Sequence, residues 1–211
     1  MLRTSLMTAL VSLIGLSLAV PSVQAKPAKP APAAKPAAEK PAAAPAHAMG
    51  MASGMSDEAM VQSAMSAAPP AVAKEARIIK VGADGAISEL RKGSNGFTCM
   101  ADNPATPGPD PMCGDANAME WAQAWIGHKT PPANKVGFMY MLEGGTDASN
   151  TDPYALKPTA ANNWVKTGPH VMVVGAMSMM QGYPESPNPD TSKPYVMWAG
   201  TPYAHLMIPI R

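Results

Sequence analysis

Asn95-Gly-Phe-Thr-Cys-Met100, a proline-rich loop and then Met112-Cys-Gly-Asp115 form a stretch that holds both cysteines of the 211-residue chain. The N-terminus carries an export signal, described below, and two cysteines in an oxidising compartment most simply form one disulfide. The spacing of Cys99 and Cys113 is far from that of a C-x-x-C metal site. We therefore predict a disulfide between them, which for a loop of this length contributes about 3 kcal/mol of stability.

The strongest helix signal of the chain follows the second cysteine and covers residues 115–126. Asp115 is a good N-cap, and apolar side chains recur at helical spacing at Met119, Ala122 and Ile126. A glycine and two prolines downstream end the helix. Because Cys113 lies two residues before the cap, the predicted disulfide would hold the start of this helix against the strand that precedes the loop.

The first residues have the features of a secretory signal peptide. Arg3 supplies a positive charge, residues 6–20 are apolar, and a small-residue pattern ends at Ala25. The apolar run is shorter than the roughly 20 residues that a membrane span needs, and no later segment is apolar enough to cross a bilayer. We therefore predict cleavage after Ala25 and a periplasmic or secreted protein without a transmembrane segment. The alternative is an uncleaved membrane anchor.

Residues 26–71 are predicted to form a disordered linker, rich in Ala, Pro and Lys at first and in Met later. Lys-Pro-Ala repeats bury too little apolar surface to offset the entropy of ordering, and their prolines favour an extended chain. Ser56 as N-cap, followed by two acidic residues, predicts a short helix over residues 57–67. The repeats resemble the spacers of cell-envelope proteins, so envelope components are the expected partners.

A methionine-rich motif in this linker is a candidate metal site. His47, Met49, Met51 and Met55 resemble in their spacing the methionine motifs of exported copper-handling proteins. Thioethers are soft ligands that suit Cu(I), or the similar Ag(I), and they persist where thiolates would be oxidised. The alternative is a flexible linker whose methionines bind no metal.

Residues 72–211 are predicted to form one α+β domain with a mostly antiparallel sheet and one main helix, its core filled in part by methionine. Turn signals separate three short strands that we expect to form an antiparallel meander. Pro209 indicates that the last strand of the chain either lies at an edge of the sheet or ends there. The predicted strands cover residues 76–81, 87–91, 97–100, 135–142, 170–175, 195–198 and 205–210.

Several classes of function are disfavoured by the sequence. Basic and acidic residues nearly balance, with a net charge of +1, so the chain lacks the basic surface that nucleic acids require. Serine-nucleophile, zinc-protease, P-loop and dinucleotide-binding motifs are absent from the sequence. The sequence therefore favours a binding protein over an enzyme.

Two histidines are the candidates for catalysis. His170 and His205 each begin an apolar strand, and they would meet at one rim of the sheet if these strands were parallel neighbours. Asp147 and Asp152 could then complete a metal or acid–base site of a hydrolase-like enzyme. The alternative is two partly buried histidines that satisfy backbone groups at the strand ends.

Five runs in the predicted folded domain resemble a group of secreted bacterial proteins without an assigned function. They lie at residues 95–100, 111–113, 149–153, 168–172 and 194–205. The resemblance implies one exported domain and carries no mechanism. Together with the linker, it favours a non-catalytic, envelope-associated binding module. A more specific version of this hypothesis is that the linker binds Cu(I). The alternative is the hydrolase-like enzyme.

If the linker binds copper, the triple variant Met49→Ala/Met51→Ala/Met55→Ala should abolish the Cu(I) affinity of the protein, because it removes the soft ligands. Anaerobic titration with a chromophoric Cu(I) chelator as competitor measures that affinity. An unchanged affinity in the triple variant would show that the linker is not the site.

Overall fold

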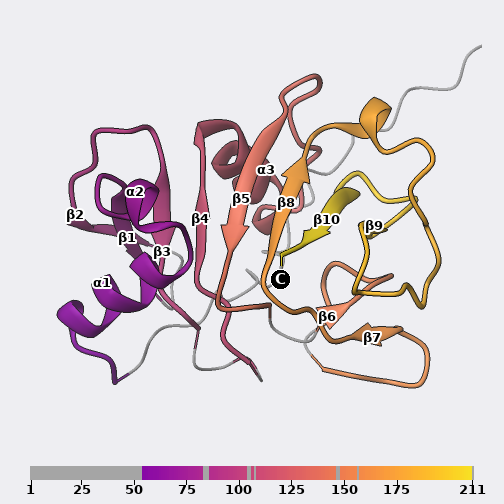
Figure 1. The fold of residues 1–211 in the computed structure, drawn as a ribbon, viewed down its shortest axis with the longest axis horizontal. Helices are drawn as coiled ribbons and strands as arrows, with labels where there is room; N and C mark the ends of the chain where they lie inside the picture. Colours follow the sequence, from indigo (N-terminus) through magenta and orange to yellow (C-terminus); the bar gives the residue numbers. More distant parts are fainter. Residues whose placement is uncertain are drawn as a thin grey trace, which may run out of the picture. The chain divides into compact units, whose positions relative to one another are not determined.

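The computed structural model describes residues 54–82, 86–103, 106, 108–145, 148–155 and 157–210. Their main element is an eight-stranded sheet in the order β2-β1-β3-β4-β5-β8-β10-β9 (Figure 1). Its pairs are antiparallel apart from β1 with β3, in keeping with the predicted α+β class. The strands are β1 (Arg77–Val81), β2 (Ile87–Arg91), β3 (Thr98–Met100), β4 (Met112–Gly114), β5 (Gly137–Met141), β8 (His170–Val174), β9 (Tyr195–Met197) and β10 (His205–Pro209).

The helices are few, and their starts follow local capping rules. They are α1 (Asp57–Ser66), α2 (Pro70–Ala73), α3 (Ala116–Ile126) and the single 3-10 turn η1 (Met177–Met179). The Asp115 carboxylate accepts the Ala118 N–H at 2.8 Å, and the Ser56 hydroxyl accepts the Ala59 N–H at 3.2 Å, so both predicted caps are confirmed. No helix among the described residues combines the length and apolar character that crossing a bilayer requires.

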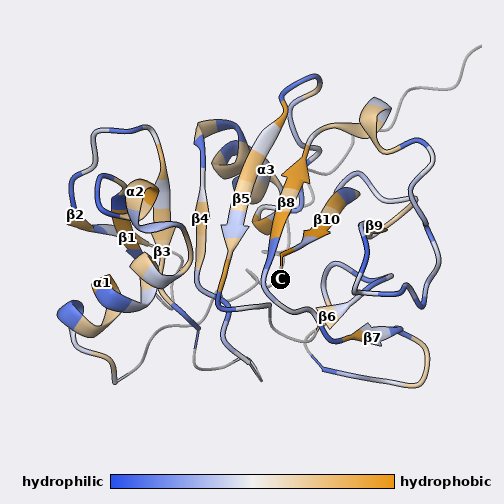
Figure 2. Ribbon diagram, viewed as in Figure 1, coloured by the Kyte–Doolittle hydropathy of each residue, from blue (hydrophilic) through white to orange (hydrophobic). Residues whose placement is uncertain are grey.

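Helix α3 covers one face of the sheet. Its Trp121 and Ala122 pack with Met139 of β5 and with the inward side chains of β8, β9 and β10. Gly137 permits this approach, because a Cβ atom there would lie 2.3 Å from the backbone nitrogen of Ala118. Figure 2 shows that β8 and β10, in this half of the sheet, are among the most hydrophobic segments.

Helices α1 and α2 cover the opposite face. Tyr140 follows Met139 on β5, so its side chain points away from α3, and it packs against the cluster that contains the alanines of α1. Ala64 of α1 is fully buried there beside Ile78 and Cys99. The predicted helix of the linker therefore forms, and it packs into the domain core rather than lying in the disordered segment assigned to residues 26–71.

The predicted antiparallel meander of the first three strands is wrong. β3 pairs with β1 in parallel, so β1 lies between β2 and β3. The chain crosses the start of β1 after leaving β2, where Ser94 N–H donates to the Glu75 carbonyl at 2.8 Å. Gly93 makes the crossing possible, because a Cβ atom there would lie 2.1 Å from the backbone nitrogen of Arg77.

The predicted disulfide is confirmed. Cys99 of β3 and Cys113 of β4 lie directly opposite each other in an antiparallel pair and are bonded. Both are fully buried under α1. The sequence did not predict β4, whose three residues lie in what we expected to be the end of a loop. The bridge thus joins two interior strands and holds the start of α3 through the chain that follows Cys113.

A small hairpin carries a long loop. β6 (Ala148–Ser149) pairs with β7 (Trp164–Val165) in a separate two-stranded sheet. At the other end of the chain, β10 lies between β8 and β9 and is thus an interior strand. Of the two alternatives for Pro209, the second is right, since β10 ends at this residue.

The double variant Cys99→Ala/Cys113→Ala should lower the free energy of unfolding by about 3 kcal/mol, because the unfolded chain regains the freedom of the loop. Urea unfolding followed by tryptophan fluorescence measures this difference. Wild-type protein in a reducing agent serves as the matched control and should lose a similar amount. A loss well below 1 kcal/mol in both samples would contradict the assigned role.

Candidate functional site

The imidazole of His205 lies in the core between α3 and the sheet. It is 1% exposed, and its ring stands perpendicular to the indoles of Trp121 and Trp198, with centroids 5.3 and 4.8 Å away. Nδ1 lies 3.0 Å from the Tyr203 carbonyl. Since a carbonyl oxygen only accepts, Nδ1 carries the proton and Nε2 keeps its lone pair.

Nε2 of His205 has no hydrogen-bond partner among the described residues. A buried acceptor left in this state costs about 1–3 kcal/mol, so a functional explanation is warranted. Burial lowers the pKa of His205 to about 4, opposed by the hydrogen bond to Tyr203 and aided slightly by the charge of His170. The ring is therefore neutral at physiological pH, and its lone pair is free to bind a cation or a proton donor.

His170 has a similar local arrangement at the start of β8. It is 3% exposed, and its Nδ1 lies 2.7 Å from the Gly168 carbonyl, two residues earlier in the chain. Burial is the main cause that lowers its pKa. These contacts match the alternative interpretation of the sequence, in which two buried histidines satisfy backbone groups at strand ends.

The two histidines lie at opposite ends of the strand pair. β8 and β10 are antiparallel, not parallel as the single-rim arrangement required. His170 therefore faces Pro209, whereas His205 faces Val174, four residues away, which is roughly 13 Å along the strands. The predicted common rim does not form.

The acidic candidates do not complete a catalytic site in the described part of the chain. Asp152 is exposed on the loop after β6, where its carboxylate accepts the Tyr154 N–H at 2.9 Å. The other acidic candidate, Asp147, lies outside the described residues.

Most of the candidate copper ligands of the linker, namely His47, Met49 and Met51, also lie outside the described residues. Met55 is half-buried just before α1. Within the described ranges, no three His, Cys, Asp or Glu side chains are grouped so as to hold a metal ion.

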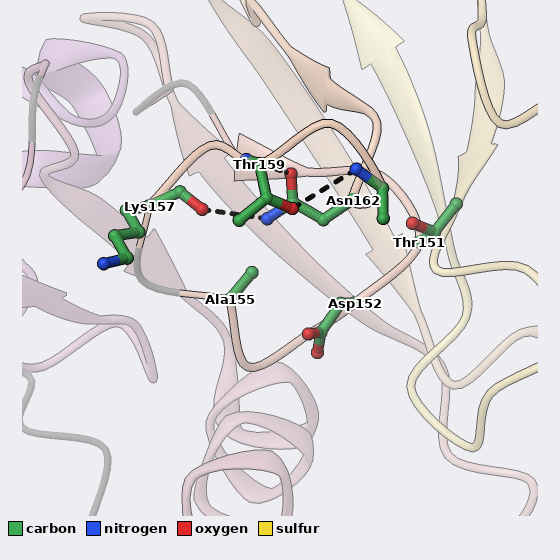
Figure 3. A pocket seen from close by; sticks show the side chains of 7 residues that line it. Thr151, Asp152, Ala155, Lys157, Thr159 and Asn162 are labelled. Carbon is green, nitrogen blue, oxygen red and sulfur yellow. Dashed lines mark hydrogen bonds between the residues drawn. The ribbon is translucent and has the colours of Figure 1, made fainter.

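The loop between β6 and β7 lines a hollow of about 670 Å³ that is open to solvent (Figure 3). This volume lies within the range of about 300–1,000 Å³ that small-molecule sites occupy. Neither His170 nor His205 is among its lining residues. The lining, which we call the loop hollow, consists of Thr151, Asp152, Ala155, Lys157, Thr159, Ala161 and Asn162.

Hydrogen bonds within the loop hold the loop hollow in shape. The buried Asn162 donates to the Lys157 carbonyl at 2.8 Å and accepts the Thr159 N–H at 2.9 Å. The buried Ser149 hydroxyl donates to the Asn162 carbonyl and accepts the Asp152 N–H at 2.8 Å. The walls are therefore set before a ligand arrives, which reduces the entropy that binding would cost.

Aromatic side chains join this loop to α3. The indole of Trp125 donates to the Pro153 carbonyl at 3.1 Å, and the Tyr154 hydroxyl donates to the Trp125 carbonyl at 3.2 Å. His128, which follows α3, stacks on the Tyr154 ring with centroids 4.0 Å apart. The loop hollow is therefore anchored to the end of α3.

Sequence reasoning missed two further buried polar atoms in the core that α3 covers. Trp121 Nε1 and the Tyr195 hydroxyl are also buried without a hydrogen-bond partner among the described residues. Both side chains belong to the same core cluster as Met197 and Met207. The sequence indicated only that Trp121 is apolar core, because its meeting with β9 and β10 depends on tertiary packing.

The chain matches no protein-family model, no curated protein and no solved structure. Its function is therefore argued from the geometry and chemistry of its own residues.

A pair of carboxyl groups occupies the loop that the disulfide closes. The pKa of Asp110 is raised to about 6. Burial is the main cause, hydrogen bonds donated by Asn103 and Thr106 oppose it, and a hydrogen bond with Asp102 adds to the rise. Folding therefore favours the protonated form of Asp110. The contribution of this protonated carboxyl to the free energy of unfolding is complete below pH 4 and is lost as the pH rises through 6.

Asp110→Asn should raise the free energy of unfolding by about 1–2 kcal/mol at pH 7.5 and leave it unchanged near pH 4, because the amide keeps the neutral form at every pH. Urea unfolding of variant and wild type at each pH measures the difference, and effects of the histidines cancel in it. Glu185→Gln, which neutralises an exposed carboxylate, is the control. Equal effects at both pH values would rule out the assigned titration.

Proposed function

We propose that this protein is an exported, non-catalytic binding module of the cell envelope that takes a polar, sugar-sized ligand in the loop hollow. The observation that carries the proposal is the shape of this loop. Its backbone and its buried Asn162 are held by internal hydrogen bonds, while exposed polar side chains line a hollow of about 670 Å³.

The chemistry of the lining supports a glycan as the ligand. Thr151 and Thr159 offer hydroxyls, which exchange hydrogen bonds with the hydroxyls of a sugar as donors or acceptors. Asp152 and Lys157 contribute one charge of each sign, so the lining carries no net charge, which suits a ligand without net charge. The small methyl groups of Ala155 and Ala161 leave room for a ring and contact its C–H groups.

Binding rather than catalysis is supported by the position of the titratable groups. The two candidate bases, His170 and His205, are buried in the sheet and do not line the loop hollow. The predicted signal peptide and linker fit a domain held near envelope glycans. The hydrolase alternative would need His170 and His205 together in one site with Asp147 or Asp152, whereas the antiparallel pairing of β8 and β10 places the two histidines at opposite ends of the strand pair.

Titration of labelled protein with chitotriose, a neutral trimer of N-acetylglucosamine, tests the proposal by NMR. We expect chemical-shift changes at the methyl groups of Ala155 and Ala161 and at the indole N–H of Trp125, which bonds to this loop. A dissociation constant of about 1 mM or lower is expected for an open site. Binding of trialanine but not of chitotriose, or shifts elsewhere only, would overturn the assignment.

The double variant Asp152→Asn/Lys157→Ala should weaken chitotriose binding at least tenfold, or about 1.4 kcal/mol, because it removes two polar walls. Lys166→Ala is the matched control, since this lysine is exposed but does not line the loop hollow. Equal affinities of the double variant and wild type would place the ligand elsewhere.

A further inference from the structure

Two methionines lie beside the unpartnered nitrogen of His205. Met197 of β9 is directly opposite His205 in the antiparallel pair, so the two side chains leave the same face with Cβ atoms about 5 Å apart. Met207 lies two residues beyond His205 on β10 and thus on that face as well. Both methionines are buried, at 4% and 2% exposure, and belong to the cluster that α3 covers.

The three side chains form a matched set of ligands. Thioether sulfur and neutral imidazole are uncharged and soft or intermediate donors, which suit Cu(I) and Ag(I). Methionine has three rotatable bonds, so its sulfur can turn toward a shared ion from either position. Among the described residues, no Asp or Glu is buried and no cysteine is free, so the surroundings of His205 offer no buried carboxylate or thiolate that would favour Mg²⁺, Ca²⁺ or Zn²⁺.

The surroundings suit an ion of low charge. The cluster is apolar, and burying a divalent ion there without a carboxylate would carry a large desolvation cost. A monovalent ion costs less, and the indoles of Trp121 and Trp198 lie beside the imidazole with centroids 5.3 and 4.8 Å away. Attraction between a cation and these electron-rich rings offsets part of the cost.

We propose that His205 Nε2, with the sulfur atoms of Met197 and Met207, forms a binding site for one Cu(I) or Ag(I) ion inside the folded domain. The site is separate from the loop hollow and from the predicted linker motif of His47, Met49, Met51 and Met55. The ion binds without change of oxidation state, and no proton is displaced because all three ligands are neutral. The simpler account of the same residues is a methionine-packed core in which water satisfies His205.

Anaerobic titration of the mature protein with Cu(I), against a chromophoric Cu(I) chelator, tests the proposal. Met197→Leu/Met207→Leu keeps side-chain volume and apolar character and should therefore fold. We expect it to lower the Cu(I) affinity at least 100-fold. The matched control is Met139→Leu/Met141→Leu on β5, which changes two buried methionines of the same cluster and should keep wild-type affinity.

Variants of the linker separate the two candidate copper sites. Met49→Ala/Met51→Ala/Met55→Ala should retain one tightly bound Cu(I) if the core site is correct. Loss of all binding in this variant would assign copper to the linker and overturn the core site. Unchanged affinity in Met197→Leu/Met207→Leu, or no binding by wild type, would also overturn it. Chitotriose binding serves as an independent readout that none of these changes should move.

NMR with Ag(I) gives a measurement that does not depend on a variant. Adding one equivalent should shift the ε-methyl signals of Met197 and Met207, the ring signals of His205 and the indole signals of Trp121 and Trp198. X-ray absorption of the Cu(I) form should show two sulfur ligands and one nitrogen ligand. Shifts confined to other methionines, or an absorption spectrum without sulfur, would contradict the assignment.

Discussion

The antiparallel pairing of β8 with β10 is the constraint on which most of this structure depends. It sits in the middle of the more apolar half of the sheet, with β5 on one side and β9 on the other. Its register aligns Met172 with Met207 on the face that α3 covers. The same register places His170 and His205 at opposite ends of the strand pair. The two histidines therefore do not share one site, although each makes a similar backbone contact.

The core between α3 and the sheet is unusually rich in methionine. Only two phenylalanines occur in the chain, and methionine fills much of the space between α3 and the sheet. Flexible thioethers fill irregular gaps well. They are also the soft ligands that remain usable in an oxidising compartment. The unpartnered Nε2 of the buried His205 is what distinguishes the proposed ion site from ordinary methionine packing in the described part of the chain.

The two proposed sites use different parts of the fold for different chemistry. The loop hollow is open, polar and built on one hairpin loop whose shape its own side chains maintain. The ion site is closed, apolar and built on two paired strands under a helix. Trp125 and Trp121, from one helix, contact the loop and His205 respectively, so α3 is the element common to both.

Local sequence determined the elements whose causes are local. Asp115 and Ser56 marked helix starts, apolar runs rich in β-forming residues marked β5, β8, β9 and β10, and two cysteines indicated their own bond. Only the tertiary structure decided that β3 pairs with β1 in parallel and that α1 enters the core. It also decided that Met197 faces His205 and that His170 and His205 lie at opposite ends of their strand pair. The physical reason is that strand pairing depends on contacts between distant residues, whose partners no short stretch of sequence specifies.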